Sequence, residues 1–419
     1  MGMEVVCGLD VHRSILVACV RGGGRKPEIE EFQTNLRELR RLDTWLTERQ
    51  CTIVGMEATG VYWKPVHHAL EGGRRVVVAN PQHIKAMKGR KTDRADAAWI
   101  ARKLVDEDGI RPNFIPELGV RETRELVRFR ENLVKARTQI RNEVQKLLAG
   151  AGVPLKEAVS DLFGVSGQEI LKQLVTGETA WDHLEGLVKG KLKRKVDQMR
   201  LALEMPLTEA QRWELGAQMK RHERTEKDFQ KVVRELGKRL KGLEEVKLRL
   251  TTIPGIAEEG ATLLLGYFGS DLGTFPTDGH FSSWIGLSPG DNESAGKKRY
   301  AGRRNGNRFL QGKFTQFAWA AVRTKGCWLQ HKYRSLCGRM AKQKAIGAIA
   351  HKLAVIVYHV IKEGTEYRDR GEAYVPNERK ARALRKAIAL IERHGGKVQI
   401  PQPEELNQGN AAAQRGFTG

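Results

Sequence analysis

The chain has few cysteines, and they do not form a framework. Five cysteines are scattered over 419 residues without a CxxC pair or the Cys/His spacing of a zinc site, which argues against a disulfide scaffold and a structural zinc. No run reaches the ~18 apolar residues of a membrane-spanning helix, and the first residues lack the pattern of a secretory signal. We therefore expect a cytoplasmic protein with reduced thiols and no membrane partner.

The chain has far fewer acidic residues than basic ones. The chain holds 50 acidic and 73 basic residues, a formal net charge of +23. Such an excess favours a polyanionic partner, because lysine and arginine neutralise phosphates and thereby supply most of the non-specific affinity for nucleic acids. The length predicts two or three domains rather than a single core.

The first part of the chain, residues 1–112, alternates short apolar runs with amphipathic stretches. Strands are predicted at 5–9, 14–20, 29–34, 52–56 and 76–79, with helices behind Asn35 and Thr92. Three strands in succession, followed by strands that alternate with helices, predict a mixed α/β sheet covered on both faces.

The rest of the chain reads as helical. Residues 113–250 carry heptad stripes, including Leu126, Leu133, Ile140 and Leu147, which predict a long coiled-coil stalk. Residues 251–368 predict an all-α domain with a helix-hairpin-helix-like turn at Pro254-Gly255 and an apolar core helix at 345–361. Residues 369–419 read as a charged, partly disordered tail.

Four carboxylates near the start of the chain form the first candidate site. Asp10 and Glu57 each end a predicted strand, and Asp93 and Asp96 share one helix face at i, i+3 spacing. If the first and fourth strands are adjacent and parallel, Asp10 and Glu57 meet at one sheet edge. Carboxylates suit Mg²⁺, and two such ions ~3.5–4 Å apart can clamp a reacting phosphodiester. Alternatively, the acids are helix caps and surface charges, with Asp93 favouring the helix dipole.

The motifs around these acids are specific in combination. They read GLDVH at 8–12, MEATGVY at 56–62 and KTDRADA at 91–97, and together they resemble the DEDD transposases of bacterial insertion sequences. The segment 253–308 resembles the C-terminal domain of that family. The resemblance implies an RNase H/RuvC-like catalytic domain, a coiled-coil stalk and a helical transposase domain. It also implies that Asp10, Glu57, Asp93 and Asp96 are catalytic ligands of Mg²⁺, for which Mn²⁺ can substitute.

A second candidate site lies in a glycine-rich basic loop. Ser294 lies in it, and serine is a weak nucleophile until a base or a metal activates it. By the resemblance, Ser294 is the nucleophile that forms a 5′-phosphoserine intermediate with DNA, while Ser288 remains an alternative. Glycines permit close backbone approach, and the neighbouring basic residues are suited to grip phosphate: Lys297, Lys298, Arg299, Arg303, Arg304 and Arg308.

The same resemblance implies the partners. They are double-stranded DNA, a structured guide RNA that pairs with donor and target DNA, and further copies of the chain in a dimer or tetramer, so that the protein is associated with the bacterial nucleoid when bound to DNA. Two alternatives remain open. One is a metal-dependent RuvC-like nuclease or junction resolvase without a covalent intermediate, and the other is a non-catalytic nucleic-acid-binding scaffold.

Overall fold

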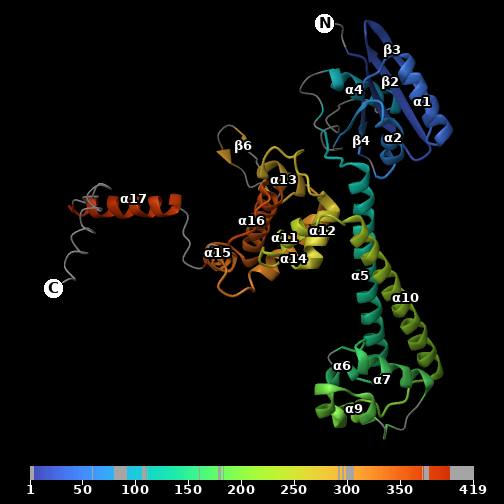
Figure 1. Ribbon diagram of the computed structural model, residues 1–419, viewed down its shortest axis with the longest axis vertical. Helices are drawn as coiled ribbons and strands as arrows, with labels where there is room; N and C mark the ends of the chain where they lie inside the picture. Colours follow the sequence, from blue (N-terminus) through green and yellow to red (C-terminus); the bar gives the residue numbers. More distant parts are fainter. Residues whose placement is uncertain are drawn as a thin grey trace. The chain divides into compact units, whose positions relative to one another are not determined.

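The chain folds into two compact units (Figure 1), which divide after Glu122. A computed structural model describes residues 4–58, 60–79, 92–105, 110, 112–159, 161–177, 181–182, 184–290, 293–294, 297–298, 306–369, 371 and 377–396. The finer division into four parts, with boundaries after residues 112, 250 and 368, remains a prediction.

A five-stranded mixed sheet forms the centre of the first unit. Its strand order is β3-β2-β1-β4-β5. Strands β1, β2 and β3 are antiparallel neighbours, whereas β4 runs parallel to β1 and β5 parallel to β4. This arrangement is consistent with an RNase H-like domain and confirms the predicted mixed sheet. Its first and fourth strands are adjacent and parallel, which is the condition under which Asp10 and Glu57 meet at one sheet edge. The strands are β1 (Val6–Val11), β2 (Ile15–Gly22), β3 (Arg25–Gln33), β4 (Ile53–Glu57) and β5 (Arg75–Ala79).

Helices cover both faces of this sheet (Figure 1). On one face, α1 (Leu36–Glu48) and α2 (Trp63–Leu70) pack against inward-facing residues such as Leu9 and Met56. The start of α1 is capped as predicted, because the side chain of Asn35 accepts a hydrogen bond from the Glu38 amide at 3.0 Å. The opposite face carries α4 (Asp93–Val105).

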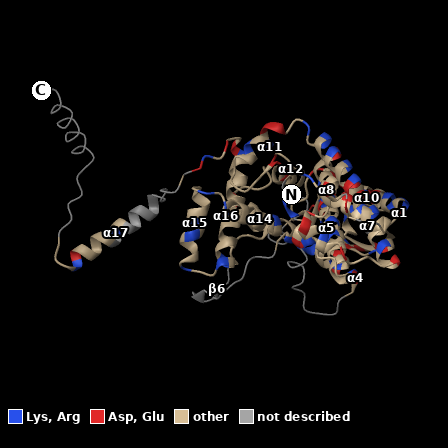
Figure 2. Cartoon of the chain, turned by 90° about the horizontal axis from the view of Figure 1, so that it is seen from below, with Lys and Arg blue, Asp and Glu red and all other residues tan. Residues whose placement is uncertain are grey.

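Two long antiparallel helices dominate the start of the second unit. The chain enters it along α5 (Leu118–Gly150) and returns along α10 (Glu209–Arg239). Ion pairs link the two helices, from Arg137 to Glu226 at 2.7 Å and from Arg221 to Glu143 at 3.0 Å. Basic and acidic residues are interspersed along α10 (Figure 2). This helix begins with a capping box formed by Thr208 and Gln211.

The packing of α5 differs from the predicted seam, and a coiled coil is not confirmed. Of the predicted seam residues, Ile140 is buried, whereas Leu126, Leu133 and Leu147 are only half-buried. The buried apolar positions shift because α5 meets different neighbours along its length. Val127 faces Gly266, whereas Val144 and Leu148 belong to the core of a small helical cluster. That cluster contains α6 (Leu155–Ala158), α7 (Val165–Thr176), α8 (Leu184–Leu187), a 3₁₀ turn (Gly190–Lys195) and α9 (Val196–Ala202).

The remaining helices pack around α16 (Lys342–Glu363), as its apolar sequence predicts. Residues 345–361 of this helix are largely buried. It is long and apolar enough to cross a membrane, and 61% of its most apolar window is buried inside the fold, so packing accounts for its apolarity. Around it lie α11 (Glu244–Thr251), α12 (Glu258–Phe268), α13 (Asp278–Ile285), α14 (Arg308–Ala321) and α15 (Trp328–Cys337); β6 (Glu293–Ser294), β7 (Lys297–Lys298) and α17 (Asn377–Arg393) complete the described elements.

Candidate metal centre and basic loop

Two glycines allow α4 to lie directly on the sheet. A β-carbon at Gly8 would come within 2.2 Å of the carbonyl oxygen of Ala97, and one at Gly55 would come within 2.8 Å of the Leu104 side chain. Side chains alternate between the faces of a strand. Asp10 and Glu57, each two residues further along, are therefore on the side that carries α4.

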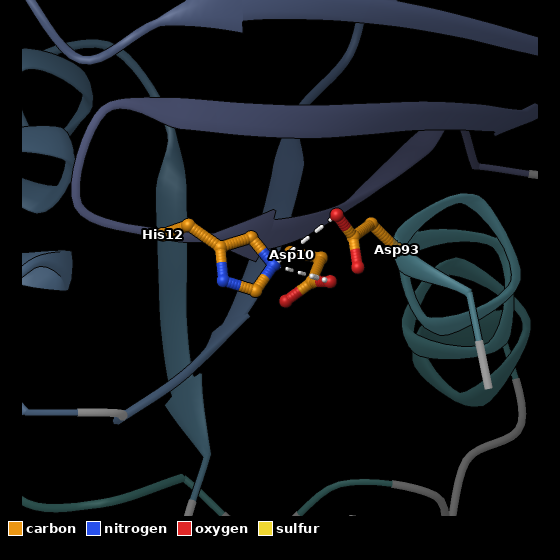
Figure 3. Close-up of side chains that lie close together, drawn as sticks. All are labelled: Asp10, His12 and Asp93. Carbon is orange, nitrogen blue, oxygen red and sulfur yellow. Dashed lines mark hydrogen bonds and ion pairs between the residues drawn. The ribbon is translucent and has the colours of Figure 1, made fainter.

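The structure brings Asp10, His12 and Asp93 together at the end of β1 (Figure 3). One ligand atom from each side chain lies within 4.8 Å of the other two. The His12 Nε2 atom is 3.2 Å from Asp10 Oδ2 and 3.5 Å from Asp93 Oδ2. Asp10 comes from β1, His12 from the turn after it and Asp93 from the first turn of α4, so three local structures converge on one point.

Local backbone bonds hold these side chains in place. The amide of His12 donates to the carbonyl oxygen of Ile15 at 2.9 Å and closes the hairpin between β1 and β2. At the start of α4, the amides of Ala95 and Asp96 each donate to the carbonyl oxygen of Thr92 at 2.9 Å. The Thr92 hydroxyl also accepts a hydrogen bond from the Ala95 amide at 3.3 Å, which confirms the predicted cap and fixes Asp93 at the helix N-terminus.

The electrostatics of Asp10 favour a cation. Burial raises the pKa of its carboxyl group, the neighbouring His12 lowers it, and the charges of Asp93 and Asp96 raise it again. Desolvation and like charges both disfavour the ionised form, and a bound cation would relieve both. Asp96 is therefore close enough to act on Asp10 electrostatically, although the three-residue cluster does not include it.

Glu57 lies beside Asp10 in the sheet and is half-buried. The last β1–β4 pair is Leu9 with Met56, and Asp10 and Glu57 are the next residues on the two strands. Within the described residues, Glu57 does not join the compact cluster. His12 is the member that our sequence reasoning did not select. Its place two residues after Asp10, in a turn of only three residues between strands, was the available signal.

The donor set fits a divalent cation. Carboxylate oxygens are the preferred ligands of Mg²⁺ and Mn²⁺, while imidazole adds affinity for transition metals. Asp10 and Asp93 offer two such carboxylates toward one point, and Figure 3 shows His12 directed at the same place. The first unit thus contains an acidic cluster that can hold a divalent ion.

The basic loop of the second unit is described in part. Ser294 lies in β6 and pairs with Lys297 of β7 in an antiparallel ladder, and Lys298 pairs with Glu293. Arg308 is the first residue of α14 and is exposed. Three of the predicted phosphate-binding residues, Arg299, Arg303 and Arg304, fall outside the described residues.

Two glycines close the base of this loop. The chain leaves α13 at Gly286, which has a φ of +86°, and re-enters α14 after Gly306. A β-carbon at Gly306 would come within 2.4 Å of the Gly286 Cα atom. The two backbones therefore cross in direct contact, and the segment between them, which contains Ser288 and Ser294, begins and ends at one place.

Ser288 is engaged in a hydrogen bond. Its hydroxyl lies 2.9 Å from that of Ser282, which is fully buried and donates in turn to the carbonyl oxygen of Gly279 at 3.2 Å. Because Ser282 uses its proton on Gly279, Ser288 is the donor between the two hydroxyls. This arrangement indicates a structural role for Ser288.

Sequence comparison places both units in one family. Residues 7–152 match the IS110-type DEDD model described as Transposase, and residues 247–334 match the model described as Transposase IS116/IS110/IS902 family. The chain belongs to the IS110 family of DEDD transposases. Residues 10, 57, 93 and 96 all fall within the first of these matches.

Curated relatives agree with this family. The chain is 26% identical to the "Probable family 20 transposase" of Pseudomonas aeruginosa over 75% of its own length and 86% of the relative. It is 25% identical to the "Transposase for insertion sequence element IS1111A" of Coxiella burnetii, over 69% of its length and 72% of the relative. A Sinorhizobium fredii protein with the transposase name y4pF/y4sB is also 25% identical, over 76% and 74% of the two chains.

Proposed function

We propose that this chain is a DNA transposase that cuts and rejoins DNA strands at a divalent-cation site. The observation that carries the proposal is the convergence of Asp10, His12 and Asp93 on one point at the edge of an RNase H-like sheet. Names of the relatives and the family membership support the reaction class, since each named relative is a transposase.

The four predicted acids are the proposed ligands of Mg²⁺, in two ions, with Mn²⁺ as a substitute. Asp10 and Asp93 contribute carboxylates to the cluster, with Glu57 and Asp96 as its neighbours. A bound divalent cation would supply Lewis-acid stabilisation of the charge that develops on the reacting phosphate. The His12 Nε2 atom lies 3.2 Å from Asp10 Oδ2 and 3.5 Å from Asp93 Oδ2, so the imidazole links the two carboxylates.

We further propose that Ser294 is the nucleophile. Its Oγ–phosphorus bond forms as the bond from phosphorus to the 3′ oxygen breaks. The serine proton passes to a base, and the 3′ oxygen takes a proton from an acid or from water and leaves as a hydroxyl. Attack by a 3′-hydroxyl of another strand reverses the step and joins the strands. The structural hydrogen bond of Ser288 favours Ser294 over Ser288, and the basic residues around Ser294 favour a phosphate ligand.

The proposed partners are double-stranded DNA, a structured guide RNA and other copies of the chain. The net charge of +23 supports a nucleic-acid partner. The guide RNA, the oligomer and association with the bacterial nucleoid in the cytoplasm rest on the family resemblance alone. Sequencing of RNA and DNA that co-purify with the protein tests the nucleic-acid partners directly.

Cleavage of supercoiled plasmid that carries the element's ends tests the chemistry. We expect nicking with Mg²⁺ or Mn²⁺ and none with EDTA, its loss in Asp10→Asn, and its retention in Glu117→Gln, which removes an exposed carboxylate elsewhere in the first unit. A protein–DNA adduct should survive denaturant in the wild type and in Ser288→Ala, and be absent in Ser294→Ala. Cleavage without any adduct would indicate a nuclease, and no cation-dependent cleavage would favour a binding scaffold.

A further inference from the structure

A groove between α5 and α14 carries polar and basic side chains where packed helices normally bury apolar ones. It consists of two adjoining hollows of about 790 and 550 Å³ that share Glu131, Lys135, Arg308 and Phe309 in their walls. The α5 wall is a stripe at three- and four-residue spacing that spans about 21 Å at the helical rise of 1.5 Å per residue. Its members are Asn132, Lys135, Gln139, Asn142 and Lys146.

The free charge of this groove is positive. Its two acidic residues are already paired, Glu131 with Lys313 and with Arg130, and Glu143 with Arg221. Within the part of the chain that the structure describes, no ion pair joins Lys135, Lys146 or Arg308 to an acid. These exposed cations therefore remain available to an anionic ligand, while Asn132 and Asn142 offer amide donors beside them.

An aromatic ring stands at the junction of the two hollows. Phe309 is half-buried and stacks with one face on Tyr267, with ring centroids 5.4 Å apart and planes 17° apart. The Lys313 ammonium group lies 5.9 Å from the centroid of the Phe309 ring. Tyr267 is itself held by hydrogen bonds to its hydroxyl from Arg128 at 2.9 Å and from Asn307 at 2.7 Å. Phe309 is thus a fixed platform rather than a loose surface ring.

We propose that this groove binds a single-stranded segment of nucleic acid, with phosphates on Lys135, Lys146 and Arg308 and a base against Phe309. Proteins that bind single strands combine a basic groove along the backbone with aromatic rings on which bases stack. The inference rests on the proposed function, because it assigns one part of the nucleic-acid substrate to a surface of the second unit. The acidic cluster takes no part in it.

The size of the groove selects a single strand over a duplex. Its hollows are comparable to small-ligand sites of about 300–1,000 Å³, large enough for unpaired nucleotides and too small for a double helix. Gly312 leaves one wall open, since a β-carbon there would meet no atom within 4 Å. A larger side chain at this position would fill the groove without changing its charge.

Fluorescence anisotropy with labelled oligonucleotides of about 16 residues, the upper end of known single-strand site sizes, tests the proposal. Lys135→Gln with Lys146→Gln should weaken single-strand binding about tenfold at physiological salt and flatten its salt dependence, since two phosphate contacts are lost. The matched control, Lys156→Gln with Lys220→Gln, removes two exposed lysines elsewhere in the second unit and should leave binding near the wild-type value.

Two further variants separate shape from charge. Gly312→Leu should weaken single-strand binding about tenfold, whereas Gly237→Leu, which adds the same side chain into open space on α10, should bind as the wild type does. Phe309→Leu keeps an apolar side chain against Tyr267 but removes the ring, and should weaken binding about fivefold. Thermal denaturation of each variant shows whether it is folded, and a misfolded Phe309 variant would leave Gly312→Leu and its control Gly237→Leu to decide.

Anisotropy measurements with single-stranded DNA, single-stranded RNA and a duplex identify the ligand. If the groove variants lose affinity for single-stranded DNA or for single-stranded RNA, the proposal is supported, and the affected nucleic acid is the ligand. Unchanged affinity for both, or an equal loss of affinity for a duplex of the same sequence, overturns the proposal. If the groove variants lose binding while the wild type shows no cation-dependent cleavage, the groove stands and the proposed chemistry fails. If the wild type cleaves DNA in a cation-dependent way and the groove variants still bind normally, the proposed chemistry stands and the groove proposal fails.

Discussion

Gly8 of β1 lies in backbone contact with Ala97 of α4, so close that a β-carbon on Gly8 would come within 2.2 Å of the Ala97 carbonyl oxygen. Asp10 follows Gly8 by two residues on the same side of its strand, and Asp93 precedes Ala97 by about one helical turn. The contact that brings α4 onto the sheet therefore also brings these two carboxylates together.

Gly8→Ala should separate α4 from the sheet and weaken the cation site. Because the colliding atoms belong to the backbone, the expected cost is about 1–3 kcal/mol of stability, typical of an overpacked core. Mn²⁺ affinity, measured by electron paramagnetic resonance, should fall with it. Gly73→Ala is the matched control, since a β-carbon at Gly73 meets nothing within 4 Å. Wild-type Mn²⁺ affinity in Gly8→Ala would refute the role of this contact.

Asp10→Asn should stabilise the protein when no divalent cation is present. The substitution removes a half-buried charge that Asp93 and Asp96 oppose, and replacement of such site residues commonly gains about 0.5–2 kcal/mol. Thermal unfolding in EDTA should therefore show a higher Tm for the variant than for the wild type.

Addition of a divalent cation should reverse that order. A ligand at 100 times its Kd stabilises the folded state by about 2.7 kcal/mol, so Mn²⁺ should raise the Tm of the wild type and leave that of Asp10→Asn nearly unchanged. Glu117→Gln should respond as the wild type does. Equal cation-induced shifts in the wild type and in Asp10→Asn would show that the ion binds elsewhere.

Acid should weaken the second unit at His222. This buried ring stacks on Phe163 with centroids 4.1 Å apart, and burial lowers its pKa. The unfolded chain, with an ordinary histidine pKa of about 6.5, then binds the proton more readily than the folded one. The stability is present above that pH and is lost as the pH falls below it. The charged groups that act on the ring are Arg141, Arg137, Glu226 and Asp161.

Urea denaturation near neutral pH and about one unit below pH 6.5 measures this effect. The midpoint should drop in acid for the wild type and drop less for His222→Gln. The pKa values of His67 and His351 are also lowered by burial, and because both remain in the variant, the difference between the two proteins isolates His222. Parallel curves for the two proteins would contradict the prediction.

The sheet and its acids were predictable because local signals agreed with the fold. Apolar runs marked the strands, Asn35 and Thr92 marked helix starts, and the parallel neighbours β1 and β4 could be anticipated from the strand–helix alternation. The membership of His12 in the cluster with Asp10 and Asp93 could not be predicted in the same way. A histidine in a short turn has no periodic signal, and only the approach of α4 places Asp93 next to it.

The packing of α5 shows where periodicity fails. Its heptad stripe predicted a seam toward a single partner helix, yet Val127, Val144 and Leu148 pack against different neighbours. Heptads describe one continuous partner, whereas α5 contacts α12 near its start and a helical cluster near its end. The polar stripe from Asn132 to Lys146 has the same three- and four-residue spacing, so spacing alone does not distinguish the wall of a groove from a solvated helix face.

Gly306→Ala should disrupt the loop that carries Ser294 while leaving the cation site intact. There is no room for a side chain at Gly306, because an added β-carbon would lie 2.4 Å from backbone atoms of Gly286. The crossing that closes the loop would have to open, at about 1–3 kcal/mol, and formation of the protein–DNA adduct should fall sharply. Mn²⁺ binding by the first unit should be unaffected. Gly312→Ala, a substitution into open space in α14, should keep adduct formation and add up to about 1 kcal/mol of helix stability. Normal adduct formation in Gly306→Ala would show that the glycine crossing does not position the nucleophile.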